Sequence, residues 1–403
     1  MQSHSALHCT EAAVLPQPNE SKVVNGDMSE ELRVVIAGGG TAGHISPMIA
    51  IADALVQQSP EARITAIGTE SGLETRLVPE AGYELRTIAK VPMPRRPSLD
   101  LIKLPFRFAA AVKAAGKILD DTEAQAVLGV GGYVCTPVYL AAKKRKLPIF
   151  VHEANARAGL ANKVGAKHAA GVGAAFSGTG LPEAKIVGMP MRGNVANMNR
   201  AELRDEAKAA LGFTPGVPAL VVTGGSSGAA SLNATIAASL DQLDDAGIEV
   251  LHITGRDKIV LDDAGNPLVS PSYRQVEYVD SMEQAYAAAD LMIARSGAGT
   301  VCELAVAGTP AVLVPLPIGN GEQRLNAADL VAAGGALLVS DDEFTAEYVK
   351  NTVIPLLKDT QGLEAMNVAA LSQGRNDAAE VMAAMIIDSL GHQVHPHATD
   401  MGN

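Results

Sequence analysis

Residues able to do chemistry first gather in a glycine-rich run directly ahead of a predicted helix. Gly38, Gly40 and Gly43 have G-x-G-x-x-G spacing, and His44 follows at once. Glycines let a ligand approach the backbone closely, and the N–H groups at a helix start attract anions. An imidazole placed there can act as a general base. A capping or packing histidine is one alternative, and a dinucleotide site with Glu70 on the ribose is another.

Two further turns of this kind lie in the second half of the chain. The run Gly224–Gly228 can offer N–H groups and the hydroxyls of Ser226 or Ser227 to a phosphate, although a simple helix N-cap is an equal alternative. Residues 295–303 place another glycine-rich turn at a strand end, with Glu303 in the first turn of the next predicted helix. There a carboxylate can complement the helix dipole or accept both hydroxyls of a ribose. Anion donors and one acidic acceptor in the same half suit a nucleoside diphosphate.

Each of these turns needs a strand that ends in it. Short apolar runs alternate with helical periodicity from Leu32 and again from Ala219, which is typical of parallel β-α-β units. We therefore expect an α/β protein with two Rossmann-like doubly wound domains facing each other across a cleft, with ligands outside the carboxyl ends of the strands. The runs are residues 32–38, 63–69, 126–132, 148–154 and 169–176, then 219–225, 249–255, 275–279, 290–297, 310–317 and 336–340.

Helical stretches and polar segments set the expected boundaries. A Gly, Pro and Asn cluster at 188–199 indicates a linker. Helices are predicted over 45–58, 232–243 and 377–390, with others beginning near Gly72 and Ala201. We expect a disordered lead-in at 1–31, a first domain at 32–195, a second at 200–376, a last helix at 377–390 that can pack back on the first domain, and a frayed tail at 391–403.

Composition narrows the classes of function. Of the 403 residues 47% are hydrophobic, enough for sizeable cores. Cys9, Cys135 and Cys302 have no spacing typical of a metal site or a disulfide framework. The net charge of −12, with 3% aromatic residues and no Trp, argues against nucleic-acid binding. No stretch of about 18 apolar residues is free of charges and prolines, which argues against a membrane span.

Eight strings carry a resemblance to a known family. In chain order they are GGGTAGHISP, GVGGYVCTP, HEANARAGLANK, VGMPMR, TGGSSGAASLN, YVDSMEQAYAAAD, RSGAGTVCELAVAGTPAVLVPLP and GEQRLNA. From about Leu32 to Leu390 they are similar to the successive motifs of the MurG family of peptidoglycan synthesis. The resemblance implies the GT-B arrangement, no metal and no cofactor. It implies transfer of N-acetylglucosamine from UDP-N-acetylglucosamine to the 4-hydroxyl of the MurNAc unit of lipid I, giving lipid II with a β-1,4 bond and inversion at the sugar.

The resemblance also implies roles for single residues. His44 would be the general base, and Glu153 and His152 compete with it for that role. Among the donor-binding residues, Val279 would lie at the uracil and Glu303 on the ribose. The donor-binding set, drawn from both domains, would be Thr41, Ala42, Gly43, Asn155, Arg192, Ser226, Val279, Ala298, Gly299, Thr300, Glu303 and Gln323.

A lipid acceptor requires contact with a membrane, and residues 90–113 suit it. They interleave apolar and basic side chains, the pattern of an interfacial helix on anionic lipid, although an ordinary core helix is the alternative. Lys and Arg outnumber Asp and Glu by 22 to 17 in residues 1–200 but are outnumbered by 10 to 27 in residues 201–403. We predict a peripheral protein on the cytoplasmic face of the cell membrane, with a membrane surface made of Met93, Arg95, Arg96, Leu101, Ile102, Lys103, Leu104, Phe106, Arg107 and Phe108.

Other functions fit parts of the same pattern. A NAD-dependent dehydrogenase would use Gly38–Gly43 and leaves the second glycine-rich series unexplained. A glycosyltransferase with a soluble acceptor, or a UDP-N-acetylglucosamine epimerase, would lack the basic and apolar surface at 90–113. A protein that only senses a nucleotide sugar would bind it without turnover.

Overall fold

The computed structural model describes residues 31–40, 42–91, 99–318 and 320–392, and only the backbone of residues 42 and 99–102. All of them belong to one unit by their contacts. All of the predicted lead-in at 1–31 except Glu31, and most of the predicted tail at 391–403, lie outside the described residues.

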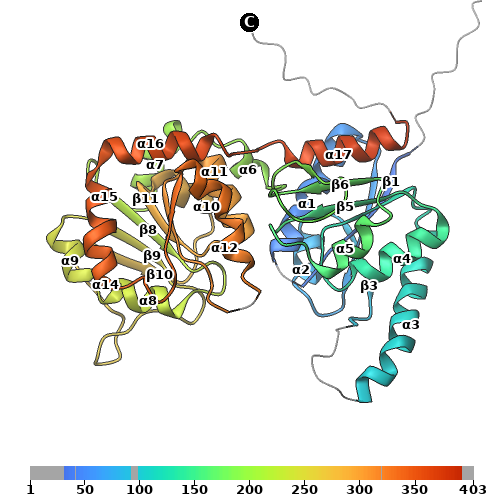
Figure 1. Cartoon of the computed structure of the whole chain (residues 1–403), viewed down its shortest axis with the longest axis horizontal. Coiled ribbons are helices and arrows are strands. Elements are labelled where there is room, and N and C mark those ends of the chain that lie inside the picture. The colour runs from blue at the N-terminus through green and yellow to red at the C-terminus, as the bar shows by residue number, and fades with distance from the viewer. Residues whose placement is uncertain (1–30, 41, 92–98, 319, 393–403) are drawn as a thin grey trace, which may run out of the picture. The chain divides into compact units, whose positions relative to one another are not determined.

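The first sheet has seven parallel strands in the order β3-β2-β1-β4-β5-β6-β7 (Figure 1). The chain moves outward from β1 to β3 and then returns to β4, on the other side of β1. The loops after β1 and β4 therefore diverge, and ligands bind at such switch points in doubly wound folds. The strands are β1 (Arg33–Ala37), β2 (Arg63–Thr69), β3 (Glu84–Ile88), β4 (Ala126–Gly129), β5 (Ile149–Glu153), β6 (Gly171–Ala174) and β7 (Lys185–Ile186), and the helices are α1 (Ala42–Gln58), α2 (Glu74–Glu80), α3 (Leu99–Asp121), α4 (Cys135–Arg145) and α5 (Leu160–Ala166).

The second sheet repeats this plan with six parallel strands in the order β10-β9-β8-β11-β12-β13. Its switch point lies between β8 and β11. The strands are β8 (Ala219–Thr223), β9 (Glu249–Ile253), β10 (Tyr273–Val276), β11 (Leu291–Ala294), β12 (Ala311–Leu313) and β13 (Ala336–Leu338). The helices are α6 (Gly193–Ala196), α7 (Arg200–Ala210), α8 (Ala230–Ala237), α9 (Leu240–Asp245), α10 (Met282–Ala288), α11 (Ala298–Ala307), α12 (Glu322–Asn326), α13 (Ala328–Ala333), α14 (Ala346–Tyr348), the π-helix η1 (Val349–Val353), α15 (Ile354–Lys358) and α16 (Thr360–Leu371).

Burial explains why the central strands were readable from sequence. Every residue of β4, β5 and β8 is buried, because helices cover both faces of a parallel sheet. The expected α/β class with two parallel sheets is confirmed. The edge strand β3 is mostly exposed and carries two charged residues, so it has no apolar run and was not predicted.

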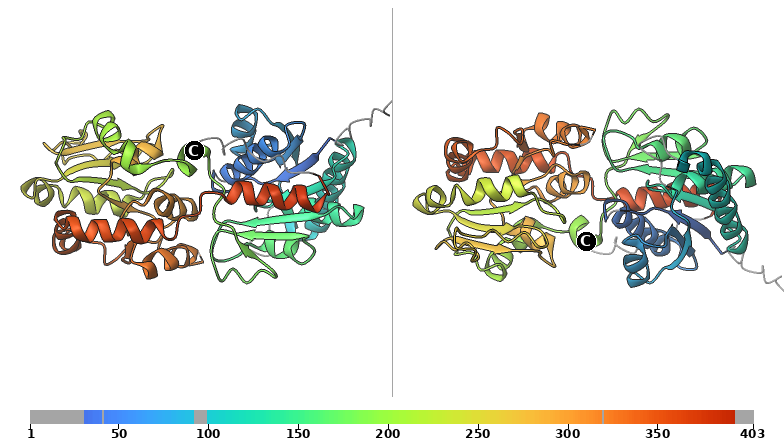
Figure 2. Two further views of the ribbon diagram at one scale, coloured as in Figure 1. Left: turned by 90° about the horizontal axis from the view of Figure 1, so that it is seen from above. Right: turned by 90° about the horizontal axis from the view of Figure 1, so that it is seen from below.

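The last helix, α17 (Ala378–Ser389), packs against the first sheet. Its Met382 and Ile386 are fully buried in one core with Ile51 and Leu55 of α1. Figure 1 shows α17 beside α1 and β6, and Figure 2 shows it against the same sheet from above. Residues far apart in the chain therefore share this core.

Two predicted elements differ in the structure. The helix expected over 232–243 is two helices, α8 and α9, that break around Ser239. The Ser239 hydroxyl donates to the carbonyl of Thr235 at 2.7 Å, a contact that competes with continued helix. The strand expected over 275–279 is β10, which ends at Val276.

Candidate active site

The glycine-rich turn between β1 and α1 is held by Glu74, a residue that no motif singled out. Gly40 has φ of +94°, a conformation that favours glycine. The buried Glu74 carboxylate accepts hydrogen bonds from Gly40 N at 3.2 Å and from N and Oγ1 of Thr69 at 2.8 and 2.7 Å. Burial alone would raise the pKa of Glu74, but these hydrogen bonds outweigh it and lower the pKa. A Cβ on Gly72 would lie 1.9 Å from Glu74 Oε2, so the nearby glycines make room for this carboxylate.

His44 lies in the first turn of α1, as predicted. Its Nδ1 is 3.2 Å from the carbonyl oxygen of Gly39. A carbonyl can only accept, so in this contact Nδ1 carries the proton and Nε2 is the basic nitrogen of the neutral ring. A Cβ on Gly131, in the loop after β4, would lie 2.9 Å from Cδ2 and Nε2 of the ring. One glycine therefore orients the imidazole and another makes room for it, which suits a general base.

Glu153, the competing candidate for the base, already serves the loop that follows β5. It is 3% exposed. Its Oε1 accepts from Asn155 N at 2.9 Å, and its Oε2 accepts from Gly159 N at 2.9 Å and Asn162 Nδ2 at 3.0 Å. These bonds fix the loop that carries Asn155, so the geometry supports a positioning role for this carboxylate.

His152 is fully buried, and its Nε2 lies 2.9 Å from the carbonyl oxygen of Gly188. Burial lowers the pKa of His152 to about 4, against a smaller opposing effect of that hydrogen bond. The geometry therefore favours His44 over both neighbours as the base.

A cavity of about 720 Å³ opens beside these groups. His44, Glu153 and Asn155 border it, together with Asn320 and Glu322 from the second half of the chain. It can hold a hydroxyl near His44 and an apolar group at the same time, because its lining also includes Val91, Leu104, Phe108, Tyr133 and Leu160.

The turn between β8 and α8 is the counterpart in the second sheet. Gly225 and Gly228 have φ of +77° and +64°, and Gly228 N donates to Gly225 O at 2.8 Å. Ser226 is exposed at the tip. Within the described residues, the peptide N–H groups of Ser226 and Ser227 donate no hydrogen bond. These N–H groups and the Ser226 hydroxyl can therefore bind an anion.

The third turn leads into α11, where the prediction for Glu303 is wrong by one turn. The helix begins directly after Gly297, so residues 298–300 form its first turn and Glu303 lies in the second. Tyr286 Oη donates to Glu303 Oε2 at 2.6 Å. Burial raises the pKa of Glu303, and the hydrogen bond from Tyr286 and the charge of Arg192 offset part of that rise. Oε1 is left, within the described residues, to accept from a ligand hydroxyl.

The remaining predicted donor residues lie on other elements. Arg192 is the exposed N-cap of α6, and Val279 is half-buried after β10. Gln323, in α12, accepts from Leu316 N through its Oε1 at 2.9 Å. In the first half, Gly43 is exposed in α1. Thr41 and the side chain of Ala42 lie outside the described residues.

Asn326 is a second residue that sequence reasoning missed, and it reaches Asn155. It is 1% exposed, and its Oδ1 accepts from Ala156 N at 2.8 Å. Its Nδ2 lies 3.4 Å from both Asn155 Oδ1 and Ser296 O. The only signal in the sequence was its place in the GEQRLNA string.

Comparison with known proteins distinguishes between the families that share such a fold. The models of the glycosyltransferase family 28 N-terminal and C-terminal domains match residues 34–174 and 219–382. The UDP-N-acetylglucosamine--N-acetylmuramyl-(pentapeptide) pyrophosphoryl-undecaprenol N-acetylglucosamine transferase of Paenarthrobacter aurescens is 55% identical over 366 residues, 91% of this chain and 98% of the relative. The transferase of the same name from Mycolicibacterium smegmatis is 48% identical over 375 residues, 92% of this chain and 97% of the relative.

The chain belongs to the MurG family, within glycosyltransferase family 28. A crystal structure of MurG from Acinetobacter baumannii has a TM-score of 0.73 at 29% identity, covering 89% of this chain and 99% of that one. The resemblance drawn from eight strings is confirmed, and the dehydrogenase alternative is excluded. A UDP-GlcNAc 2-epimerase from Neisseria meningitidis has a TM-score of 0.63 at 14% identity over 89% of this chain and 100% of that one, which shows the shared fold alone.

In this MurG-family chain the predicted membrane surface is divided between two faces of α3. Phe106 is 77% exposed, and Lys103 and Arg107 are exposed beside it. Leu104 and Phe108 are instead half-buried and line the cavity that His44 borders, because residues four apart share one face of a helix. The structure does not describe the side chains of Met93, Arg95, Arg96, Leu101 and Ile102.

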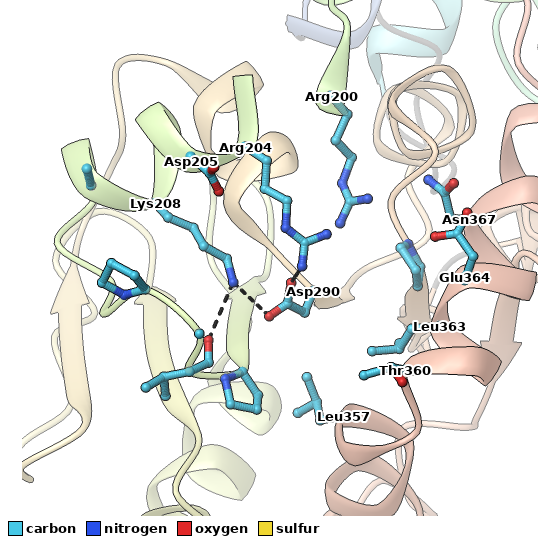
Figure 3. Close-up of a pocket in the computed structure, with 16 residues that line it drawn as sticks. Arg200, Arg204, Asp205, Lys208, Asp290, Leu357, Thr360, Leu363, Glu364 and Asn367 are labelled. Carbon is cyan, nitrogen blue, oxygen red and sulfur yellow. Dashed lines mark hydrogen bonds and ion pairs between the residues drawn. The ribbon is translucent and has the colours of Figure 1, made fainter. Parts of the chain in front are cut away.

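A second cavity, of about 650 Å³, lies in the second half of the chain, beside the amino ends of the strands of the second sheet (Figure 3). Asp290, directly before β11, accepts from Lys208 Nζ at 3.0 Å, from Ala219 N at 2.8 Å and from Arg204. Arg200 donates to two backbone carbonyls, and burial lowers its pKa to about 10. Ligands of doubly wound folds bind at the carboxyl ends of the strands instead. In this MurG-family chain the charged residues Arg204, Lys208 and Asp290 therefore serve to join α7 to the sheet.

Two further features concern the described residues as a whole, namely the length of their helices and the grouping of their metal-binding side chains. None of the described helices is long and apolar enough to cross a membrane. No three side chains of His, Cys, Asp or Glu within this part of the chain gather in a way that would hold a metal ion.

Proposed function

We propose that the chain transfers N-acetylglucosamine from UDP-N-acetylglucosamine to N-acetylmuramyl-(pentapeptide) pyrophosphoryl-undecaprenol, lipid I, and so makes lipid II. The names of relatives 48 to 55% identical over about nine-tenths of the chain support both substrates. The observation that carries the proposal is the cavity that an oriented imidazole, His44, and several apolar side chains line together. A lipid-linked sugar needs both features, since its hydroxyl must give up a proton and its lipid needs an apolar surface.

In the proposed reaction the 4-hydroxyl oxygen of the MurNAc unit attacks C1 of N-acetylglucosamine as the bond from C1 to the UDP oxygen breaks. His44 Nε2 takes the hydroxyl proton, and UDP leaves with the electron pair. Attack from the face opposite UDP inverts the anomeric centre from α to β. The tautomer set by the Gly39 carbonyl supports this role, because it puts the lone pair of the neutral ring on Nε2.

The departing UDP gains negative charge, and we propose that the second sheet stabilises it. Ser226 and the turn at 298–300 would bind the diphosphate, with Arg192 beside them. Glu303 Oε1 would accept from the ribose, Val279 would lie at the uracil, and Gln323 would reach the sugar with its amide nitrogen. The proposed reaction uses neither a metal ion nor another cofactor.

We propose that the two domains bind different substrates. Residues 32–195 would bind the acceptor and the membrane, and residues 200–376 the donor. Residues 377–390 would add their helix to the first domain. Lys103, Phe106 and Arg107 on the exposed face of α3 support a peripheral place on the anionic cytoplasmic face of the cell membrane.

The test is transfer of labelled N-acetylglucosamine from its UDP donor to detergent-solubilised lipid I, with and without EDTA. We expect transfer in both conditions and a β-linked product. Tight binding of the donor without transfer to lipid I would instead point to a soluble acceptor or to a nucleotide-sugar sensor. Transfer abolished by EDTA and restored by a divalent cation would contradict the metal-free reaction.

A further inference from the structure

The donor turn at 224–228 rests on a second turn, residues 254–258, which follows β9. Gly228 and Gly255 both have positive φ, +64° and +91°. A Cβ on Gly228 would lie 2.1 Å from the carbonyl oxygen of Thr254, and a Cβ on Gly255 would lie 2.4 Å from the Cα of Gly228. No side chain fits between the two turns, so the position of one turn determines that of the other.

A buried hydrogen-bonded chain anchors the second turn. Asn233 Nδ2 donates to the carbonyls of Thr254 at 3.1 Å and Lys258 at 3.2 Å, so its Oδ1 faces His252 Nε2 at 3.0 Å. His252 Nδ1 in turn accepts from Tyr273 Oη at 2.8 Å. Burial lowers the pKa of His252 to about 4, which keeps the ring neutral. The hydrogen bonds to Asn233 and Tyr273 then satisfy both ring nitrogens. The backbone of Lys258 is therefore fixed from the core outward.

From this fixed backbone the side chain of Lys258 reaches the donor turn. Its Nζ donates to the carbonyl oxygens of Ser227 at 2.7 Å and Gly228 at 3.4 Å. Carbonyl oxygens repel a phosphate, and an ammonium group bound to them neutralises that repulsion. Positive charge matters here, because residues 201–403 hold 10 Lys and Arg against 27 Asp and Glu.

We propose that Lys258 is a positioning residue of the donor site. It holds the Ser227 and Gly228 carbonyls away from the diphosphate and places a positive charge beside the N–H groups of Ser226 and Ser227. The inference rests on the proposed function, since it takes the turn at 224–228 as the place of the diphosphate.

The test compares binding of UDP with binding of uridine, which lacks the diphosphate, by titration calorimetry on the full chain. The variants are Lys258→Gln, Lys258→Arg and the matched control Arg256→Gln. Arg256 is an exposed cation of the same turn that makes no hydrogen bond or ion pair with the described residues. Michaelis constants for UDP-N-acetylglucosamine are measured beside them.

We expect Lys258→Gln to weaken UDP binding about tenfold, the value of one charge-assisted hydrogen bond, while uridine binding changes less than about twofold. KM for the donor should rise in parallel, with kcat within about threefold of the wild type. Lys258→Arg keeps the charge and should restore most of the UDP affinity. Arg256→Gln should change either affinity by less than about twofold, as expected for an exposed charge without a partner.

Three outcomes would overturn the inference. Equal effects of Lys258→Gln and Arg256→Gln on UDP affinity would show that only the net charge near the turn matters, and that the contact of Lys258 with the carbonyls does not. A parallel loss of uridine and UDP binding in Lys258→Gln would show a collapsed site and no role toward the diphosphate. Absence of UDP binding by the wild type would overturn the donor assignment itself, and is distinguishable because no variant enters that measurement.

Discussion

Replacement of His44 by Asn separates the proton transfer from the architecture that holds the imidazole. The amide nitrogen of Asn can occupy the place of Nδ1 and keep the bond to Gly39 O, which is 3.2 Å long in His44, but it offers no basic nitrogen. His44 is partly exposed in the first turn of α1, so little buried packing is lost. A general base contributes about 10²- to 10⁴-fold to the rate, which corresponds to about 2.7–5.5 kcal/mol in activation free energy.

We therefore expect His44→Asn to lower kcat for transfer to lipid I by about 10²- to 10⁴-fold, with KM for the donor and the melting temperature nearly unchanged. Single-turnover transfer of labelled N-acetylglucosamine measures the chemical step directly. The matched control is His168→Asn, an exposed histidine of the same half that does not line the cavity. A kcat for His44→Asn within about tenfold of the wild type would refute the assignment of the base, and a loss confined to KM would make His44 a binding residue.

Three further predictions concern stability and the membrane. Because the pKa of Glu74 is lowered in the folded protein, its carboxylate stabilises the fold above the ordinary pKa of 4.5, and this contribution is lost as the pH falls below that value. In acid, the melting temperature of Glu74→Gln should therefore depend less on pH than that of the wild type. Parallel plots of melting temperature against pH for the two proteins would contradict this. Asp290→Asn leaves the buried Lys208 ammonium without its counter-ion and should lower the free energy of unfolding by about 3–5 kcal/mol in urea titrations, whereas a loss under about 1 kcal/mol would show that another group compensates. Phe106→Ser combined with Lys103→Glu should reduce co-sedimentation with anionic vesicles while transfer to detergent-solubilised lipid I persists, and undiminished vesicle binding would place the membrane surface elsewhere.

How far the elements were predictable follows from burial. Strands such as β4 and β8 are buried on both faces, so their composition alone identifies them. The edge strand β3 carries exposed charged residues and pairs with β2 alone, so it has no such signature. The break between α8 and α9 depends on a hydroxyl that bonds to a carbonyl four residues earlier, a choice that helical periodicity does not contain.

Some residues of the candidate site were predictable from the sequence, and others were not. His44 and Ser226 were predicted because each lies next to glycines within a short contiguous string. The roles of Glu74 and Asn326 were missed because the contacts that tie them to the site, with Gly40 and Ala156, span 34 and 170 residues. No local pattern of the chain records contacts of that separation.

The sequence by itself therefore determined the α/β class, the glycine-rich turns at the strand ends, the family and the histidine at the helix start. Local backbone preference and the burial of apolar runs decide the class and the turns, and both are properties of neighbouring residues. The family and the histidine follow from short contiguous strings of the chain. Only the tertiary structure decided which nitrogen of His44 is basic, that Glu153 is committed to its own loop, and that Lys258 reaches the donor turn. These depend on how side chains and backbone lie in space, both within one turn, as at His44 and Glu153, and between separate turns, as at Lys258. A hydrogen bond needs a short distance and a favourable angle between its atoms, and the order of residues does not record either.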